Sequence, residues 1–199
     1  GSMPEAIASA DFNGDGYSDV VTNADSRCTV LLSNGDGTFK AKSSYSSSTT
    51  IKDVTTGDVN GDGKVDIISV NYYGGTASVY LGNGDGSFKA RTSYKATSNP
   101  ISAIVCDVNG DSIADIVTAD YSYEVHSDNV LSVFIGNSDG TFKAKTSFCA
   151  YYELDITACD VNGDNKLDII AAGAYDVNVF LSNGDGTFTV TAGSVNCFN

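Results

Sequence analysis

The stretch that decides the fold is Asp58-Val-Asn-Gly-Asp-Gly-Lys-Val-Asp66, a nine-residue loop sequence that occurs four times in the chain. The other copies begin at Asp11, Asp107 and Asp160, so the starts are 47, 49 and 53 residues apart. A second motif, Asn83-Gly-Asp-Gly-Ser-Phe88, follows the first, and its other copies end at Phe39, Phe142 and Phe188. Self-similarity at a nearly fixed period indicates a repeat architecture. The chain therefore divides into four repeats, at about residues 4–48, 49–98, 99–151 and 152–199.

Each repeat carries four strand signals. In the second repeat they are the run from Val54 to Gly57, Asp66-Ile-Ile-Ser69, Ser78-Val-Tyr-Leu81 and the run that starts at Phe88. Asn-Gly and Asp-Gly between apolar runs are strong hairpin signals. Four up-and-down strands, repeated about every fifty residues, are typical of propeller blades. The sequence predicts an all-β fold, a β-propeller of four blades, each a four-stranded antiparallel sheet.

The repeats leave almost nothing else in the chain. Gly1-Ser2-Met3 is typical of an expression scar and carries no fold information, so residues 4–199 are predicted to form a single propeller domain. Both ends of the chain fall at blade boundaries, which favours a closed four-bladed ring. Two alternatives stay open: half of a larger ring that a homodimer completes, and a fragment of a longer chain.

Charge excludes some partners. The chain has 11 Lys and Arg residues against 25 Asp and Glu, a net charge of −14, whereas nucleic acid is bound by basic surfaces. An anionic membrane surface is excluded for the same reason, and no apolar run approaches the roughly 18 residues that membrane insertion needs. The acid is mostly Asp, with 22 Asp against 3 Glu, and short Asp side chains suit turns and hard cations.

The nine-residue loops, hereafter the Asp loops, have the composition of metal sites. They place oxygen donors at positions 1, 3, 5 and 9, and position 7 can add a backbone carbonyl. This alternation resembles the first half of a helix-loop-helix calcium loop, while zinc and copper would favour His or thiolate ligands. Three carboxylates in one loop repel one another unless a cation joins them. We therefore predict up to four structural calcium ions, which would bring the net charge from −14 to −6; the alternative is a set of metal-free Asx turns.

The four Asp loops differ from one another at position 6, and they differ from the second motif in the number of carboxylates. Position 6 needs a sharp turn and is Gly16, Gly63, Ser112 and Asn165 in the four copies. If position 6 is left-handed, the Asp107 loop is predicted to bind calcium most weakly, because Ser tolerates that conformation less well than Gly or Asn. The second motif has one carboxylate per copy, too few for a calcium site, and is interpreted as a hairpin turn whose Phe caps the blade core.

These loops and hairpins resemble the FG-GAP (also VCBS) repeat family over about residues 4–199. Integrin alpha-chain heads and some secreted lectins share the blade type, although they use seven blades. The resemblance implies a β-propeller with calcium in the loop between the first and second strands of a blade. The side-chain ligands that it implies are Asp11, Asn13, Asp15, Asp19, Asp58, Asn60, Asp62, Asp66, Asp107, Asn109, Asp111, Asp115, Asp160, Asn162, Asp164 and Asp168. The implied carbonyl ligands are those of Tyr17, Lys64, Ile113 and Lys166.

Other candidate residues lie outside the Asp loops. The longest insertion, Tyr121–Asp128, holds the single histidine, and its Tyr121, Tyr123 and His126 could bind a ligand; the alternative is a long solvated loop. Cys106 and Cys159 at matching positions are interpreted as buried thiols rather than a bridge. The other cysteines are Cys28, Cys149 and Cys197, and a Cys28–Cys197 bridge could close the ring. The outer strands, at residues 40–45 and 89–94, are rich in Lys, Ser, Thr and Tyr. They are interpreted as solvated edges, and the alternative is a binding groove between blades.

The functional prediction is a non-enzymatic, calcium-binding recognition or adhesion module of a secreted or surface protein. Its expected ligand is an extracellular glycan or protein. Extracellular calcium modules bind the ion at roughly 10⁻⁴ to 10⁻³ M, which suits the exterior of the cell. No nucleophile motif supports an enzyme. The alternatives are a structural repeat unit without a ligand of its own and an accessory domain of a hydrolase.

Overall fold

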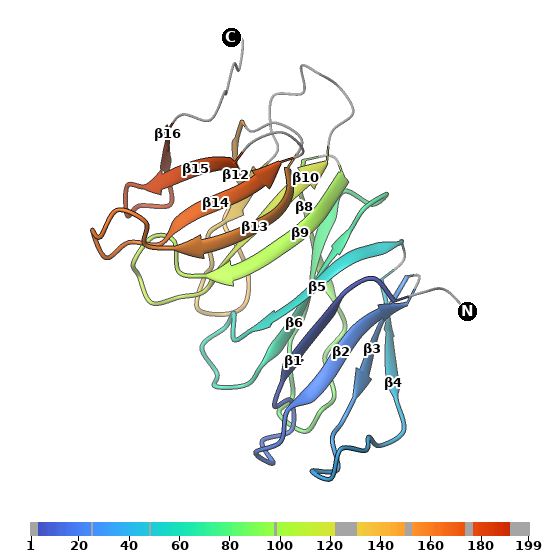
Figure 1. Ribbon diagram of the computed structural model, residues 1–199. Coiled ribbons are helices and arrows are strands. Elements are labelled where there is room, and N and C mark those ends of the chain that lie inside the picture. Colours follow the sequence, from blue (N-terminus) through green and yellow to red (C-terminus); the bar gives the residue numbers. More distant parts are fainter. Residues whose placement is uncertain are drawn as a thin grey trace.

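The computed structural model describes residues 4–24, 26–47, 49–97, 99–121, 131–149, 153–173 and 177–191. These residues form strands, turns and bends, and contain no helix. The strands make four antiparallel four-stranded sheets, and within each sheet the strands are neighbours in chain order (Figure 1). The prediction of an all-β fold with four four-stranded blades is confirmed.

The blades follow one another along the chain. Blade 1 consists of β1 (Ile7–Ala10), β2 (Asp19–Ala24), β3 (Arg27–Leu31) and β4 (Ser43–Ser46). Blade 2 consists of β5 (Ile51–Gly57), β6 (Asp66–Asn71), β7 (Thr76–Tyr80) and β8 (Thr92–Lys95). Blade 3 consists of β9 (Asn99–Cys106), β10 (Asp115–Tyr121), β11 (Leu131–Phe134) and β12 (Thr146–Phe148). Blade 4 consists of β13 (Glu153–Cys159), β14 (Asp168–Gly173), β15 (Val177–Ser182) and β16 (Phe188–Thr191).

The first strands of the blades lie side by side: β5 contacts β1 and β9, and β9 contacts β13. Close packing explains the small residue at the end of each first strand. A Cβ atom at Gly57 would lie only 2.7 Å from Cγ1 of Val105 in the next blade. The Asp loop then turns the chain into the second strand, where Asp66 pairs with Gly57.

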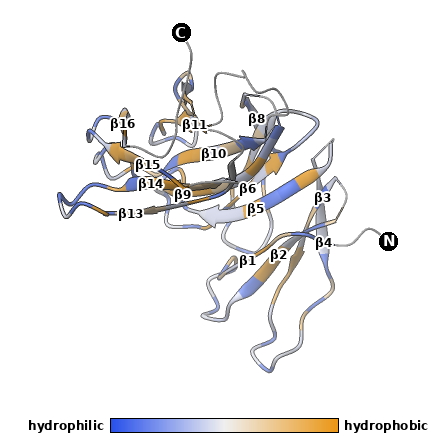
Figure 2. Cartoon of the chain, turned by 45° about the horizontal axis from the view of Figure 1, so that its top comes forward, coloured by the Kyte–Doolittle hydropathy of each residue, from blue (hydrophilic) through white to orange (hydrophobic). Residues whose placement is uncertain are grey.

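The hydrophobic core lies between the blades. Three clusters fill the spaces between successive blades, and each takes alternate residues from the two sheets that face each other. Between blades 1 and 2, for example, Phe12 meets Phe88 edge to face, with ring centroids 5.4 Å apart. Hydrophobic colouring follows the strands in Figure 2, whereas the loop that joins β13 to β14 is mostly hydrophilic.

The four blades form an open arc. Blades 1 and 4 lie at opposite ends of it (Figure 1). The expectation of a closed four-bladed ring is therefore wrong. Motif spacing counts the blades, but ring closure depends on the rotation from each blade to the next, which side-chain packing between the sheets determines.

No helix that is long and apolar enough to cross a membrane occurs in the part of the chain that the structure describes.

Candidate functional site

The first carboxylate of each Asp loop anchors the loop backbone. Asp58 accepts hydrogen bonds at Oδ1 from the amide of Gly61 at 2.8 Å and at Oδ2 from the amide of Gly63 at 2.7 Å. The equivalent bonds form in the other three loops. The pKa of Asp11 is lowered first by the amide of Gly16, and that of Asp160 first by the amide of Asn165. Backbone donors therefore favour the ionised form of these carboxylates.

Positions 3 and 5 continue this turn. The amide of Asp62 lies 3.2 Å from Oδ1 of Asp58 and 3.0 Å from Oδ1 of Asn60, so oxygens from positions 1 and 3 face the same N–H group. Oδ1 of Asp62 then accepts the amide of Lys64 at 3.0 Å. The contacts of Asn60 with Asp62 and of Asp62 with Lys64 are Asx turns, in which an Asp or Asn oxygen accepts an amide two residues further on. The sequence thus gathers oxygen donors on one curled, exposed loop.

Position 9 has a different role. The carboxylates of Asp19, Asp66, Asp115 and Asp168 are fully buried. Oδ2 of Asp66 accepts the amide of Val59 at 2.9 Å, and Oδ1 accepts the amide of Gly82, beyond the third strand, at 2.8 Å. The same pair of bonds occurs in every blade. Each position-9 carboxylate therefore joins the start of its Asp loop to the end of the third strand.

Electrostatics bears on whether the loops suit a cation. Burial raises the pKa of Asp66, and the charges of Asp58 and Asp62 raise it further. Burial and the charges of Asp111 and Asp107 do the same to the pKa of Asp115. A cation beside these groups would offset their mutual repulsion.

Lysine already approaches the position-5 carboxylate in three loops. Nζ of Lys64 lies 3.7 Å from Oδ2 of Asp62, and Lys166 and Lys40 make similar exposed ion pairs with Asp164 and Asp15. Across the described ranges, Asp111 has no such ion pair, and its loop has Ile113 at position 7. An ammonium group here shows that the loop surface attracts positive charge.

The donor chemistry fits calcium, but the carboxylates are not drawn together around one point. Within the described ranges, no group of three or more His, Cys, Asp and Glu side chains is placed to hold a metal ion. The reason is that position 9 points into the blade. Oδ1 at position 1 accepts up to three N–H groups, whereas Oδ2 at position 1 and the Oδ1 atoms at positions 3 and 5 accept one each. An oxygen that accepts one N–H has a second lone pair for a hard cation. Position 5 is exposed in all four loops and positions 1 and 3 are at least partly exposed, so these are the donors that a cation meets first.

The backbone at position 6 is left-handed in all four loops. Its φ is +85° at Gly16, +79° at Gly63, +65° at Ser112 and +64° at Asn165. The prediction that the Asp107 loop binds calcium most weakly required a left-handed backbone at position 6, and the structure has one there. The affinity itself stays a prediction.

The second motif is a hairpin turn, as expected. Oδ1 of Asp85 accepts both the amide and the hydroxyl of Ser87, and the amide of Asn83 donates to the carbonyl of Ser87 at 2.9 Å. Hydroxyl and amide donors lower the pKa of Asp85. Phe88 is buried in the cluster between blades 1 and 2, in accordance with its predicted capping role.

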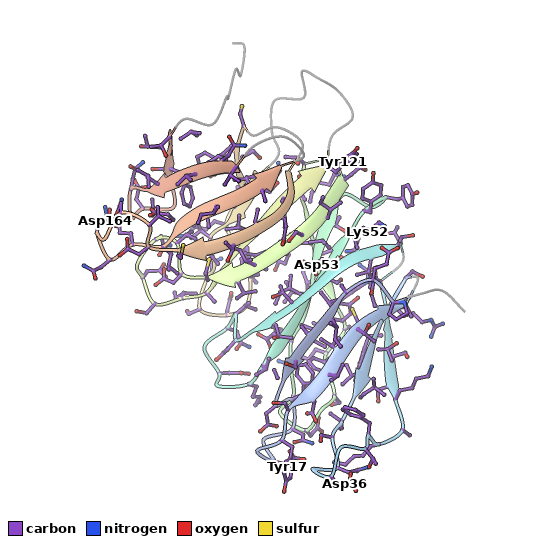
Figure 3. The ribbon with its side chains drawn as sticks, viewed as in Figure 1. Tyr17, Asp36, Lys52, Asp53, Tyr121 and Asp164 are labelled. Carbon is purple, nitrogen blue, oxygen red and sulfur yellow. The ribbon has the colours of Figure 1, made fainter. Side chains whose placement is uncertain are left out.

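Tyr121, one of the three residues predicted to bind a glycan or protein ligand, lies away from the Asp loops. Tyr121 ends β10, whereas the Asp loop of that blade precedes β10 at Asp115. Figure 3 places Tyr121 at the top of the molecule and Tyr17, in the first Asp loop, at the bottom. Tyr123 and His126 lie outside the described residues. The insertion and the Asp loop therefore leave opposite ends of the same strand.

The cysteines give no support for a bridge near the axis. Cys106 and Cys159 are free thiols, but neither is fully buried as predicted: Cys106 is half-buried and Cys159 is exposed. Cys159 is exposed because no blade covers that side of blade 4. Cys28 is buried and free, and burial raises its pKa to about 11. Cys197, its suggested partner, lies outside the described residues.

Two grooves lie between neighbouring blades. One, of about 270 Å³, lies between the Asp loops of blades 2 and 3 and is lined by residues that include Asp58, Asp107 and Ser138. The other, hereafter the outer groove, has a volume of about 530 Å³ and lies between the outer strands of blades 1 and 2. Its lining residues are Ser44, Tyr45, Ser46, Tyr80, Lys89, Ala90 and Arg91. A groove between blades was the alternative interpretation of these outer strands, and the structure has one where blades 1 and 2 meet.

Comparison with known proteins supports the repeat assignment. The model of the FG-GAP-like repeat matches residues 11–69 and 58–118, which together cover more than half of the chain. The chain belongs to the FG-GAP-like repeat family. The two matches overlap, and each runs from one Asp loop past the next, so the repeat unit of this FG-GAP-like protein is the blade with its loop.

Solved structures share the fold of this FG-GAP-like chain. A lectin of Agrocybe aegerita, described as recognising non-reducing terminal N-acetylglucosamine, has 24% identity and a TM-score of 0.62, over 92% of this chain and 50% of the lectin. A rhamnogalacturonan lyase of Bacillus licheniformis has 15% identity and a TM-score of 0.62, over 94% of this chain and 42% of the lyase. BBS1N, solved in complex with ARL6DN, has 13% identity and a TM-score of 0.58, over 96% and 56%. This chain thus spans about half the length of these structures, and no curated protein matches it.

Proposed function

We propose that this chain is a non-enzymatic recognition module of a secreted or surface protein, stabilised by up to four structural calcium ions. The observation that carries the proposal is the Asp loop, which has the same pinned carboxylate and the same run of Asx turns in all four blades. Oxygens at positions 1, 3 and 5, which are at least partly exposed, would hold the ion together with carbonyl oxygens at position 7. Bound calcium would offset the repulsion between the loop carboxylates and so stabilise the folded blades.

Calcium binding is tested by titration calorimetry and thermal unfolding of the purified chain. Four sites are expected, with dissociation constants of roughly 10⁻⁴ to 10⁻³ M. Each site would add about 2.7 kcal/mol to the free energy of unfolding at a hundredfold excess over Kd. The variant Asp62→Asn removes one charge but keeps an oxygen for the amide of Lys64, so it should lose one site.

The matched control is Asp85→Asn in the hairpin turn, which also removes one exposed carboxylate while keeping an acceptor for Ser87. It should retain all four sites. Equal calcium binding by both variants and the unmodified chain, or no calcium heat at all, would contradict the metal proposal.

A glycan is the ligand that we propose. The similar lectin supports this choice only through its fold. The outer groove adds chemistry of its own: Tyr45 contributes an aromatic surface, while Lys89, Arg91 and two serine residues line it with hydrogen-bonding groups. Aromatic rings combined with a few convergent polar groups are typical of small-molecule sites. The insertion at Tyr121, with Tyr123 and His126, is the second candidate surface.

A glycan array distinguishes the possibilities, first in calcium and then in EGTA, with glycans that end in N-acetylglucosamine included. The proposal expects calcium-dependent binding to a defined set of sugars. Arg91→Ala should reduce that binding at least tenfold, whereas Lys42→Ala, at the equivalent position of blade 1, should leave it unchanged because Lys42 does not line the outer groove. A blank array from folded, calcium-loaded protein would contradict glycan recognition and favour a protein ligand or a scaffold role.

A further inference from the structure

The two ends of the arc expose faces that are buried everywhere else in the molecule. Each blade has a front face toward the preceding blade and a back face toward the following one. In blade 2 the front face is Val54, Ile67, Tyr80 and Phe88, and the back face of blade 1 that meets it includes Phe12, Val21, Cys28 and Val30. Blade 1 has no preceding blade, and blade 4 has no following blade in the arc (Figure 1).

The front face of blade 1 is apolar and uncovered. Ile7 is 72% exposed, whereas its equivalents Val54, Ala103 and Ile156 are 3–6% exposed. Phe39 is 45% exposed, against 8% for Phe88 in blade 2. Blades 2, 3 and 4 pack the equivalents of these two residues against the preceding blade. Blade 1 therefore has the residues of a blade-to-blade interface but no neighbouring blade on this side.

The back face of blade 4 is also apolar and uncovered, and it carries the residues that meet a front face in the internal interfaces. Val161 is 44% exposed, whereas its equivalents Phe12, Val59 and Val108 are 0–3% exposed. Val177 is 55% exposed, whereas Cys28, Ala77 and Leu131 at the matching position are 0–1% exposed. The two ends of the arc therefore carry complementary halves of an interface that the chain already makes three times.

A contact between a hairpin glycine and an aliphatic side chain, hereafter the glycine socket, recurs at the internal interfaces. In each internal interface, an aliphatic side chain of one blade packs on the hairpin glycine of the next. A Cβ atom would meet Leu32 at 2.6 Å if built on Gly86, Leu81 at 3.1 Å on Gly140, and Ile135 at 2.6 Å on Gly186. At Gly37 in blade 1 a Cβ atom would meet nothing within 4 Å, so this socket is empty. Its missing aliphatic partner corresponds to Leu181 at the far end of the arc.

We propose that a second copy of this chain covers both faces, so that two arcs close into one eight-bladed ring. The front face of each copy would pack on the back face of the other, with Leu181 seated on Gly37 at both junctions. By analogy with the bond from Gly86 to the carbonyl of Phe12, the amide of Gly37 would donate to the carbonyl of Val161. Because the front and back faces are different surfaces, such a dimer closes only if the rotation that relates one copy to the next is 180°.

The test is the mass of the full chain in solution, measured by light scattering and sedimentation from 1 µM to 500 µM in 150 mM NaCl with calcium. The salt screens the repulsion between two acidic chains. We expect a dimer of twice 20.6 kDa. Ile7→Asp on the front face and Val161→Asp on the back face should each raise the dimer dissociation constant at least a hundredfold. Tyr73→Asp changes an equally exposed ring in blade 2 and should leave it unchanged.

Mixing the two face variants provides a stricter test. Each alone should be monomeric, but the mixture should form a 1:1 complex, because the Val161→Asp chain keeps an intact front face and the Ile7→Asp chain an intact back face. Circular dichroism controls for folding, which these exposed positions should not disturb. A monomer over the whole range would overturn the proposal and leave further repeats of a longer chain as the cover. A ladder of larger polymers, or loss of the dimer with only one face variant, would overturn it too.

Discussion

A single aspartate holds each blade together at the rim where its Asp loop lies. Asp66 accepts two backbone amides, from Val59 and Gly82, and its carboxylate is fully buried. The carboxylate therefore has a structural role that does not depend on any metal. The position-9 carboxylate was singled out in the sequence only as a calcium ligand, because its spacing from position 1 is visible in the sequence, whereas its contact with residue 82 depends on the fold.

The variant Asp66→Ala should lower the free energy of unfolding by about 2–4 kcal/mol in EDTA, because two buried amides lose their acceptor. Urea denaturation without calcium measures this loss apart from any effect on metal binding. Asp62→Ala in the same loop is the control, since its exposed carboxylate should contribute less than about 1 kcal/mol. Equal losses in the two variants would argue against the structural role of position 9.

The serine at position 6 of the third loop carries backbone strain. Ser112 has a φ of +65°, and a left-handed residue other than Gly costs about 1–2 kcal/mol. Ser112→Gly should therefore stabilise the chain by about 1 kcal/mol and tighten calcium binding at that loop. Gly63→Ser is the reciprocal control and should destabilise by a similar amount, since the space around Gly63 is open and only its backbone is affected. Titration calorimetry that fits four equal sites would contradict the predicted weakness of this loop.

Cys28 links stability to alkaline pH. Burial raises its pKa from 9.0 to about 11, so the folded protein favours the neutral thiol. This contribution, on the order of 2–3 kcal/mol, is fully present below pH 9 and is lost as the pH rises from 9 to 11. Cys28→Ala, which introduces the residue that blade 2 has at this position, should flatten the decline in urea stability over that range. Cys159→Ala changes an exposed thiol, so the urea stability of this variant should decline over that pH range as the stability of the unmodified chain does.

At the scale of the strand and hairpin, the spacing of the motifs was sufficient for most of the blade. Asn83-Gly84 and its copies predicted a hairpin, and the runs before and after each Asp loop predicted the two inner strands. The start of the fourth strand was not predictable in the same way. Phe88 makes an isolated bridge with Gly82, and regular pairing with β7 begins only at Thr92, where β8 starts. In blade 4 the strand β16 does begin at Phe188.

The hairpin phenylalanine should matter only where a preceding blade covers it. Phe88→Ala should cost about 3–4 kcal/mol, because Phe88 is buried edge to face against Phe12 and Tyr45. Phe39→Ala should cost less than about 1 kcal/mol when measured on the monomer, because its ring is half exposed. Chemical denaturation of the dilute protein compares them, and similar losses would show that the capping contact is made within one blade.

At the scale of the whole molecule, the arc is a stack in which each blade contacts its neighbours in the chain. Structures built in this way gain stability from interfaces between neighbours, so their ends are the least stable parts. The sequence identifies Ile7 and Val161 as members of the apolar pattern, but it does not say whether a blade lies against them. That depends on the accumulated rotation between the sheets, and this is why the closed ring was predicted wrongly.

Hydrogen exchange should reveal this gradient. In dilute protein, amides of β6, β7 and β10 should exchange slowest, and those of β1 and β15 several-fold to a hundredfold faster, because the end blades have one bare face. Mass spectrometry of the peptides resolves the blades. Uniform protection across all four blades of a verified monomer would contradict the stack as the source of stability.

The glycine socket also bears on how such chains change over evolutionary time. The aliphatic side chain and the glycine that it contacts are encoded in consecutive repeats. Each repeat contains one aliphatic residue and one glycine of this kind. A gene that duplicates or loses one in-frame unit of about fifty codons therefore creates a junction that already fits. Blade number can change in a single recombination event, while the contacts that hold a blade in place are inherited unaltered.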